Sequence, residues 1–375
     1  VLQNTAVPET PGQDKISIFS TVDGFVSAIN EFGETVAFVT QPFNRNVIIN
    51  GSFDYAQRQD PAVATIYNSV GGRVYGPDRW FLSVSANSIH YKVSSNMNSS
   101  ESGISAAYVG DFIRNSAGTP KFLVGQVVES LNMMHLRGFR VRLTCKMKWE
   151  VGAAVMRMGL LQVTSAGTQD VVPSAPGTFV TAWGVDTVDP TFGTNLALVS
   201  PIVGSAEGGV IENDALTCTL AAGWITYSVA YWVPINARNL IPVFWSNIGL
   251  ANGIEIDITE VDLHAGGRIR DWMPMNPLEQ LRLNQRYFAK TFPPSVVPAW
   301  NTGPLGTLVG SVGVSGASIY ASTIHWNFPS EMRKAPTITT FNPEVSTIQI
   351  RNYVHTNACT NAAGANITIA GSDIL

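Results

Sequence analysis

Two short stretches decide the fold of this chain: VIINGSFDY at residues 47–55 and VYGPDRWFL at residues 74–82. Each joins apolar residues that favour strands to residues that favour tight turns, Asn50-Gly51 in the first and Gly-Pro-Asp in the second. The first stretch predicts a strand that ends at Asn50-Gly51. The second predicts a turn followed directly by a core strand.

The aromatic residues of the two stretches indicate where the core lies. We expect Phe53 and Tyr55 to point the same way into a β-sandwich and Trp80 to fill its interior. Asp78 and Arg79 are expected to hold the turn before Trp80. A direct sugar contact is the alternative role for Phe53 and Trp80. The residues expected to determine the fold are Asn50, Gly51, Phe53, Asp78, Arg79 and Trp80.

The composition of the 375-residue chain favours turn-rich β-structure. Charged residues make up only 13% of it, hydrophobic residues 45%, and there are 33 glycines. Since charge keeps monomers soluble, a chain with so little of it either buries surface against partners or is an extracellular β-protein with a neutral surface. We favour burial against partners.

Several classes of protein are excluded by the same counts. A net charge of −4 and a pI near 5.8 argue against nucleic-acid binding, which needs a basic surface. Cys145, Cys218 and Cys359 are too far apart for a zinc module, and we expect reduced, buried thiols. We expect no signal peptide, because residues 1–15 have neither a basic nor an apolar region, and no membrane span, because no apolar run reaches about 20 residues.

The sequence pattern predicts an all-β protein with one connector helix. The turn at Asp23-Gly24 between alternating runs predicts a hairpin followed by a third short strand. About ten further alternating runs predict a jelly-roll sandwich. The predicted units are an extended arm (1–14), a β-hairpin segment (15–44), the jelly-roll sandwich (45–272), the connector helix (273–292) and a smaller C-terminal β-sandwich (293–375).

Two of the predicted strands show a clear two-residue period. In FRVRLTCKMKWE, residues 139–150, apolar positions alternate with Arg140, Arg142 and other polar residues, which predicts one face in water. The run IEIDITEVDL predicts the same for Glu255, Asp257 and Thr259.

The helix prediction rests on MNPLEQLRLNQRYFAKTF. Asn276 is expected to cap it, Pro277 suits its first turn, and the helix should end near Lys290. Leu278, Leu281, Gln285 and Phe288 mark one face of this helix, which we expect to act as a connector.

Four stretches, in order, resemble bacteriophage virion proteins of the tail-fibre, appendage or head-fibre type. Residues 7–38 resemble a hairpin segment near the start of many phage structural proteins. NVIINGSFDYAQRQ with YGPDRWFL resembles the opening of carbohydrate-binding-module-like jelly rolls. Residues 258–290 resemble the last strand of that domain and the helix after it, with Asn284 where relatives carry Cys. WNFPSEMRKAPTITTFNP resembles the strand that opens a trailing domain.

This resemblance implies a virion component that is assembled in the host cytoplasm, with other virion proteins of capsid, neck or tail as partners. It also implies a homo-oligomer, expected to be a trimer, and possible binding of a host-surface glycan. The segment expected to attach the chain to the virion contains Ile16, Ile18, Phe19, Asp23, Gly24 and Phe25.

No catalytic, metal-binding or cofactor-binding pattern is present in the sequence. The five histidines stand singly, and no nucleophile elbow occurs. Carboxylates that could serve a glycan depolymerase, or Ca²⁺ in the loops, are Asp186, Asp189, Glu207, Glu212, Asp214, Glu255 and Asp257. Aromatic residues placed for sugar stacking are Trp183, Trp272 and Trp300.

Three functions remain open at this point. The favoured one is a fibre or appendage subunit that presents its sandwich to host-surface glycan. The alternative is a purely structural head-decoration or neck protein. A glycan depolymerase is less favoured, so we expect the chain not to be an enzyme.

Overall fold

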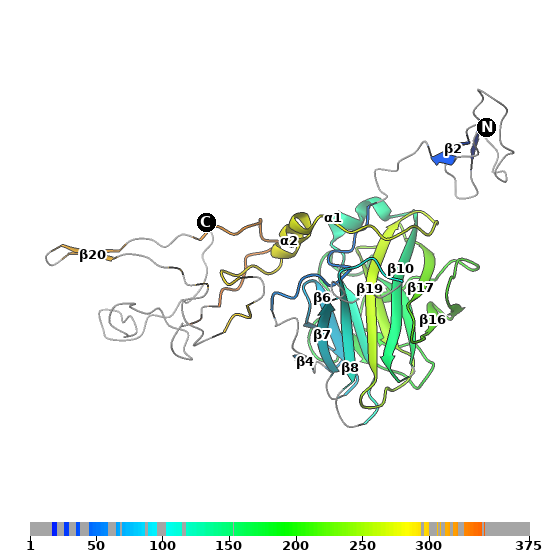
Figure 1. The fold of residues 1–375 in the computed structure, drawn as a ribbon, viewed down its shortest axis with the longest axis horizontal. Coiled ribbons are helices and arrows are strands. Elements are labelled where there is room, and N and C mark those ends of the chain that lie inside the picture. Colours follow the sequence, from blue (N-terminus) through cyan, green and yellow to red (C-terminus); the bar gives the residue numbers. More distant parts are fainter. Residues whose placement is uncertain are drawn as a thin grey trace.

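The computed structural model describes residues 17–20, 26–29, 35–37, 45–58, 65–67, 70–86, 89–95, 103–114, 118–152, 154–293, 296–299, 306, 308, 312–315, 318–321, 326–339 and 341. Of these, the part from Arg45 to Phe292 forms a β-sandwich with helical segments at one end (Figure 1). The predicted all-β class is confirmed. The predicted C-terminal sandwich lies mostly outside the described residues. The part of it that is described includes a short hairpin of β20 (Val312–Ser315) and β21 (Ser318–Ala321).

The sandwich consists of two antiparallel sheets. The first has the strand order β17 (Ile225–Trp232), β10 (Arg140–Val151), β19 (Glu255–Ala265), β8 (Tyr108–Arg114), β7 (Ile89–Ser95) and β4 (Thr65–Tyr67). The second has the order β15 (Val210–Glu212), β16 (Ala215–Thr219), β11 (Val155–Val163), β18 (Asn239–Ser246), β9 (Phe122–Gln126), β6 (Trp80–Val84) and β5 (Val74–Tyr75), with β14 (Leu196–Leu198) beside β11.

The main core lies between the two sheets and is rich in aromatic residues. Phe53 stacks on Trp80 with ring centroids 5.0 Å apart, and Phe112 meets Phe53 edge-on at 6.1 Å. A second apolar cluster covers the outer face of the second sheet, where Phe81 and Phe179 meet at 4.9 Å. The second sheet is therefore buried on both faces, which explains why every residue of β6 and β18 is buried.

Outside the sandwich, the predicted N-terminal meander is present. Strands β1 (Ser17–Ser20), β2 (Val26–Ile29) and β3 (Thr35–Ala37) form a three-stranded sheet in which Ile18 pairs with Ala28 and Phe19 with Ser27. The turn residues Asp23, Gly24 and Phe25, and also Ile16, lie outside the described residues.

Two short α-helices lie at the same end of the sandwich (Figure 1), α1 (Ser130–Met133) with a 3₁₀ turn (Met134–Leu136) after it, and α2 (Pro277–Gln285). Asn276 caps α2 as predicted, since its side chain accepts hydrogen bonds from the backbone N–H groups of Leu278 and Glu279. No helix in the described part is long and apolar enough to cross a bilayer.

The face of α2 that Leu278, Leu281, Gln285 and Phe288 mark is not the face that packs on the sandwich. Leu278 is 72% exposed, whereas Gln280 and Asn284 are buried against the sandwich. The helix therefore docks through amide groups, which an apolar-periodicity argument cannot detect. The helix also ends at Gln285, one turn earlier than expected.

The water-exposed faces predicted for β10 and β19 are also wrong. Arg142, Lys148 and Asp257 are all at least nine-tenths buried, because loops from distant parts of the sequence cover them. The guanidinium of Arg142 donates to the carbonyls of Ser205 and Gly267, and Lys148 lies over the ring of Trp224. The alternation correctly predicts the strands β10 and β19, but it does not report solvent exposure here.

Candidate binding grooves at the helical end of the sandwich

The Asn50 turn is the centre of a buried polar network. Asn50 has φ = 61°, a left-handed conformation that Asn tolerates better than most residues. Its amide donates to the carbonyls of Tyr55 and Asp78 at 2.8 and 2.9 Å and accepts from Tyr55 N–H at 3.0 Å and from Gln280 at 3.2 Å. Asn50 thus ties the first decisive stretch to the second and to α2.

Two neighbours of Asn50 explain the rest of the first stretch. A side chain at Gly51 would lie 2.3 Å from the carbonyl oxygen of Val261, so only glycine fits there. Phe53 and Trp80 are fully buried, and the indole N–H of Trp80 donates to the carbonyl of Asn50 at 2.8 Å.

Two expectations for this stretch fail. Tyr55 does not join the core, because it is only half-buried and its hydroxyl donates to Pro277 at 2.7 Å. Residues 46–50 form no strand, although Val47 N–H donates to the carbonyl of Leu263 at 2.9 Å.

Asp78 is buried and joined to the first stretch. Its carboxylate accepts from the backbone and side chain of Gln57 at 3.1 and 2.6 Å. Burial raises the pKa of Asp78, while the nearby Arg58 charge, 3.7 Å away, acts in the opposite direction. Asp78 therefore does more than hold its own turn.

Arg79 has φ = 75° and is buried against the C-terminal part of the chain. Its guanidinium donates to the carbonyl of Val127 at 2.7 Å and lies 3.4 Å from the ring centroid of Tyr287. Burial lowers the pKa of Arg79 from its ordinary value. Its structural partner is thus the RYF segment after α2, which sequence reasoning missed.

A second arginine fastens the trailing segment to the same place. Arg333 pairs with Glu129 at 2.8 Å and with Asp170 at 3.4 Å, and its backbone N–H donates to the carbonyl of Arg286. The stretches NGSFDY, GPDRW, NQRYF and EMR consequently meet at one end of the sandwich.

A groove of about 470 Å³ lies between the Asn50 turn and the segment that leads into α2. Trp272, which sequence analysis selected for sugar stacking, lines it. Met273 beside it is 77% exposed. Ser52 and Asn276 also line the groove. Ser52 is buried and its hydroxyl donates to Asp54 at 2.7 Å, so the polar side chain open to a ligand is that of the exposed Asn276.

The charged residues around this groove are paired. Arg45 and Glu279 form an exposed ion pair at 3.1 Å across it. Arg270 binds the buried Asp262 through two hydrogen bonds of 2.7 and 2.8 Å. The groove therefore presents mainly neutral chemistry to a ligand.

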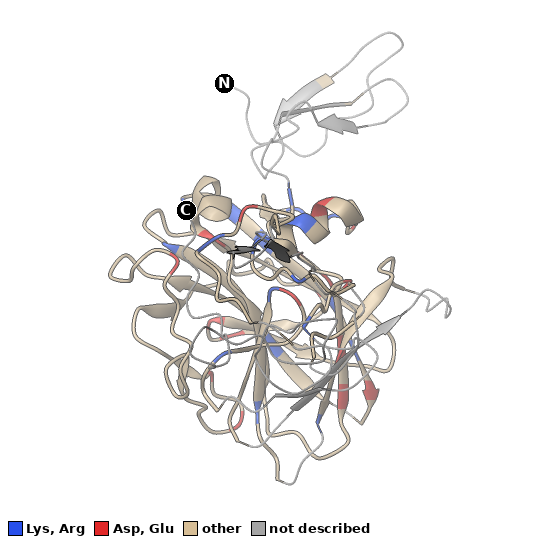
Figure 2. Ribbon diagram, turned by 90° about the vertical axis from the view of Figure 1, so that its left-hand side faces the viewer, with Lys and Arg blue, Asp and Glu red and all other residues tan. Residues whose placement is uncertain are grey.

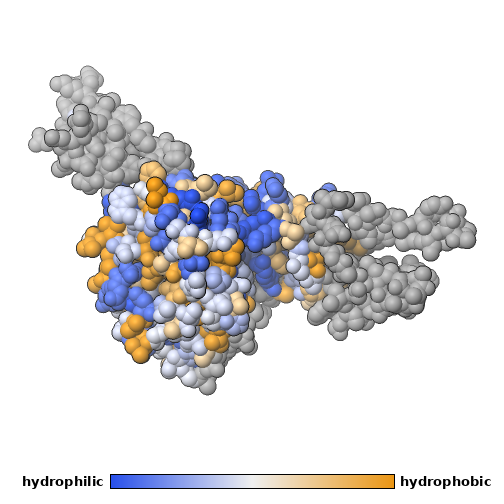
Figure 3. All heavy atoms as spheres, turned by 180° about the vertical axis from the view of Figure 1, so that it is seen from behind, coloured by the Kyte–Doolittle hydropathy of each residue, from blue (hydrophilic) through white to orange (hydrophobic). Residues whose placement is uncertain are grey.

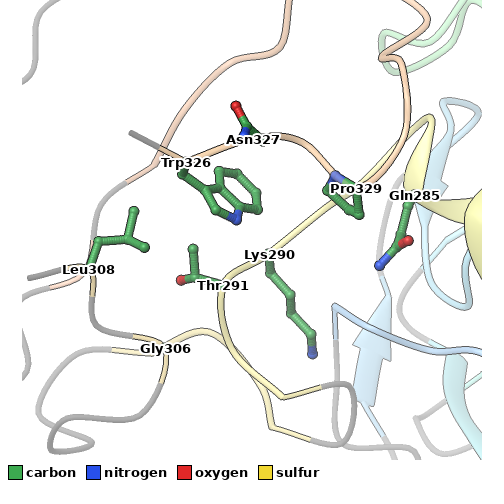
Figure 4. Close-up of a pocket in the computed structure, with 8 residues that line it drawn as sticks. All are labelled: Gln285, Lys290, Thr291, Gly306, Leu308, Trp326, Asn327 and Pro329. Carbon is green, nitrogen blue, oxygen red and sulfur yellow. The ribbon is translucent and has the colours of Figure 1, made fainter. Parts of the chain in front are cut away.

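A second hollow of about 480 Å³ lies beyond the other end of α2 (Figure 4). The indole of Trp326 lies between Leu308 and Pro329, while the side chain of Asn327 points away from Lys290. The amino group of Lys290 donates to the carbonyls of Gln57 and Val296, and burial lowers its pKa to about 8. Since these polar groups do not converge, this hollow is the weaker candidate.

The other two tryptophans selected from the sequence are not brought to the groove. Trp183 is half-buried and packs against the second apolar cluster. Trp300 lies outside the described residues.

Three of the carboxylates considered for depolymerase chemistry lie near one another: burial, and then the charges of Asp214 and Glu212, act to raise the pKa of Asp189. Asp189 pairs with the buried Arg157 at 2.6 Å, and Asp186 lies 3.3 Å from Lys121. Glu212 accepts from Thr217, and Asp214 accepts from Ser200. Glu207 has a backbone bridge to Ser228.

Glu255 and Asp257 do approach a third acidic residue, Asp111, on the neighbouring strand β8. Oxygen atoms of the three side chains lie within 4.8 Å of one another. Desolvation, and then the charge of Asp111, raise the pKa of Asp257 to about 8. Because Asp111 and Asp257 are 2% and 4% exposed, a glycan has no access to them.

The geometry defines a β-sandwich whose helical end carries an aromatic groove. No family model matches the chain, and no curated protein matches it in sequence. Solved structures are similar at low identity. The tailspike protein 4 domain of bacteriophage CBA120 has 10% identity and a TM-score of 0.34, with 60% of this chain and 23% of the tailspike chain covered.

Two carbohydrate-binding modules are also similar to this chain. The module TmCBM61, solved with β-1,4-galactotriose, has 12% identity, a TM-score of 0.31, and 58% and 97% of the two chains covered. The C-terminal family 22 module of a Clostridium thermocellum protein has 11% identity, a TM-score of 0.28, and 60% and 98% covered.

Proposed function

We propose that this chain is a non-enzymatic subunit of a bacteriophage fibre or appendage. In this proposal the segment 15–44 joins other virion proteins, the chain assembles with copies of itself as a trimer, and the sandwich binds host-surface glycan in the groove beside Trp272.

The observation that carries the proposal is the meeting of the decisive stretches around Asn50. The stretches whose order resembles phage virion proteins are 200 or more residues apart at their extremes, and Asn50 joins Asp78 and Gln280 through one amide group. Because these stretches contact one another in the fold, they support the view that the chain shares one architecture with the proteins it resembles.

The groove supports the glycan part of the proposal on chemical grounds. A sugar ring stacks its C–H face on an aromatic ring while its hydroxyl groups bond to nearby amides and hydroxyls. Trp272 provides the ring, and Asn276, whose side-chain oxygen caps α2, provides its amide NH₂ group as a donor. The pairing of Arg45 with Glu279 favours a neutral sugar at this position.

The non-enzymatic part is supported by the state of the carboxylates. Hydrolysis of a glycosidic bond needs two accessible carboxyl groups on either side of the substrate. Asp257 and Asp111 are close but buried, and Asp189 is held by Arg157.

The test is adsorption of the isolated protein to host cells and to a glycan array, with Trp272→Ala as the variant. We expect the variant to lose at least about tenfold in affinity, as for a central aromatic contact. Trp224→Ala is the matched control, because Trp224 is also half-buried but precedes Ile225, which pairs with Met147 at the end of β10 away from the helical segments.

Two results would contradict the proposal. If Trp272→Ala and Trp224→Ala bound glycan equally well, the groove beside Trp272 would not be the binding site. Particles that lose integrity without the protein yet adsorb normally would favour the head-decoration or neck role instead.

A further inference from the structure

One stretch of the lining of the groove beside Trp272 is apolar. Trp272, Met273, Pro274 and Met275 follow one another in the chain, and all of them line the groove. Met273 is 77% exposed and Met275 is half-buried. The buried side chain of Ile48 also lines the groove. The aromatic ring is therefore accompanied by flexible apolar side chains that are open to a ligand.

Most polar side chains of the lining are already bonded inside the protein. The amide of Asn46 makes its hydrogen bonds to backbone groups of the protein. Asn50 and Gln280 are buried and are bonded to each other through their amides, and Arg270 is held by Asp262. A ligand that is covered with hydroxyl groups finds few partners here, and a buried hydroxyl group without a partner weakens binding.

Asn276 is the exception in this lining. Its side-chain oxygen accepts hydrogen bonds from the backbone N–H groups of Leu278 and Glu279. Within the described part of the chain its NH₂ group donates to no protein group, and the residue is exposed. The groove therefore offers one open amide donor next to apolar side chains.

The charges near the groove are of both signs and pair with one another. Figure 2 shows basic and acidic positions close together at the helical end of the sandwich, and α2 itself carries Glu279 and Arg282. Arg45 pairs with Glu279 at 3.1 Å. Apolar and hydrophilic side chains lie side by side at the top of the sandwich in Figure 3, which is the same end. A neutral ligand with an apolar part matches this surface.

An N-acetyl group has the properties that this lining requires. Its carbonyl oxygen accepts a hydrogen bond, its methyl group is apolar, and the group carries no charge. A plain hexose has a hydroxyl group in its place, which needs polar partners and gives no apolar contact. Binding sites of this kind recognise a ligand through apolar surface and a few placed polar groups.

We infer that the groove beside Trp272 selects neutral sugars that carry an N-acetyl group. The NH₂ group of Asn276 donates to the acetyl carbonyl, the acetyl methyl packs on Met273, and the sugar ring stacks on Trp272. This inference rests on the proposed function, because it narrows the glycan of that groove to the N-acetylhexosamines.

The direct test compares oligosaccharides that differ only in this group. Chitotriose and cellotriose have the same length and linkage, and only chitotriose carries N-acetyl groups. We expect the full-length protein to bind chitotriose at least about tenfold more tightly in titration calorimetry, as for a small group that fits an apolar pocket. N-acetylgalactosamine and galactose form a second pair, which tests the same preference on the other common hexose ring.

Variants of the lining assign the preference to its residues. Asn276→Asp keeps an oxygen that caps α2 and removes the NH₂ donor, so it should bind the N-acetylated sugar about tenfold more weakly with little change for the plain sugar. Met273→Ser should also bring the two affinities closer together. Met134→Ser is the matched control, because Met134 is 49% exposed and does not line the groove; it should leave both affinities unchanged.

The outcomes separate this inference from the proposed function. Equal binding of the two sugars in both pairs, or tighter binding of the plain sugars, would overturn the inference and leave the glycan-binding role in place. A preference for N-acetyl that survives both Asn276→Asp and Met273→Ser would also overturn it. If the wild type bound no sugar on the array or in titration, the proposed glycan binding itself would be wrong, and the inference would fall with it.

Discussion

The guanidinium of Arg79 lies 3.4 Å from the ring centroid of Tyr287, more than 200 residues further along the chain. Both residues are part of short stretches that stand out in the sequence, yet their relation is visible only in three dimensions. The contact is buried, so the attraction between the cation and the aromatic ring is not screened by water.

This contact predicts a difference between two variants of Tyr287. Tyr287→Ala should lower the free energy of unfolding by about 2 kcal/mol or more, since the desolvated cation loses the ring. Tyr287→Phe keeps the ring and should be close to wild type. Urea unfolding measures both, and equal losses for Phe and Ala would show that the hydroxyl, and not the ring, carries the contact.

Asn50 predicts a larger effect. Asn50→Ala removes an amide that makes four hydrogen bonds to three residues and leaves buried polar groups unsatisfied, so we expect a loss of about 3–5 kcal/mol. Asn276→Ala is the control, because it removes only the cap of α2 and should cost about 1 kcal/mol. A smaller loss at position 50 than at position 276 would contradict the central role of Asn50.

The raised pKa of Asp257 predicts that stability falls as the pH rises. The folded protein holds this proton up to a pH of about 8, whereas the unfolded chain releases it near its ordinary value, so the stabilising effect is lost between these two values. Asp257→Asn should remove this part of the pH dependence and be more stable than wild type at pH 9. Thermal unfolding from pH 4 to 9 measures it.

Asp262 provides the opposite case in the same strand. Hydrogen bonds from His264 and Arg270 outweigh desolvation and lower its pKa. Its contribution is present at neutral pH and lost as the pH falls through the lowered value. Asp262→Asn should therefore be less stable than wild type at pH 7, with a difference that shrinks in acid. A difference in stability between wild type and Asp262→Asn that stays the same from pH 7 into acid would contradict this assignment.

Removal of residues 1–40 tests the attachment segment. The sandwich core lies between Val47 and Ala265, so the shortened protein should fold with unchanged circular dichroism. We expect it not to enter the virion, which an assembly assay with purified particles measures. Continued incorporation would remove the attachment role from segment 15–44.

The sheet pattern was predictable because strand alternation and turn residues are local properties. FRVRLTCKMKWE predicts β10, and the Asn276-Pro277 pair predicts the start of α2. Burial of the polar side of β10 was not predictable, since Ser205 and Gly267, which cover Arg142, are 63 and 125 residues away in sequence. The amide packing of Gln280 has the same origin, because its partner Asn50 lies 230 residues earlier.

The candidate site was predictable only in part. The position of Trp272 next to turn residues predicts a ligand contact, and Trp272 does line a groove. The same rule predicts a ligand contact for Trp183, which instead packs against the second apolar cluster. An aromatic residue beside a turn is thus compatible with either role, and the neighbours that decide between them come from other strands.

The bonds of Asn46 impose an order of events during synthesis. Its side chain accepts from Leu263 N–H and donates to the carbonyl of Val261, partners 217 and 215 residues downstream. At about 5–20 residues per second, a ribosome delivers those partners on the order of tens of seconds after Asn46 has emerged. The segment at Asn46 must therefore wait for β19 to be synthesised before it can bond, and a product that ends before β19 would leave Asn46 without these partners.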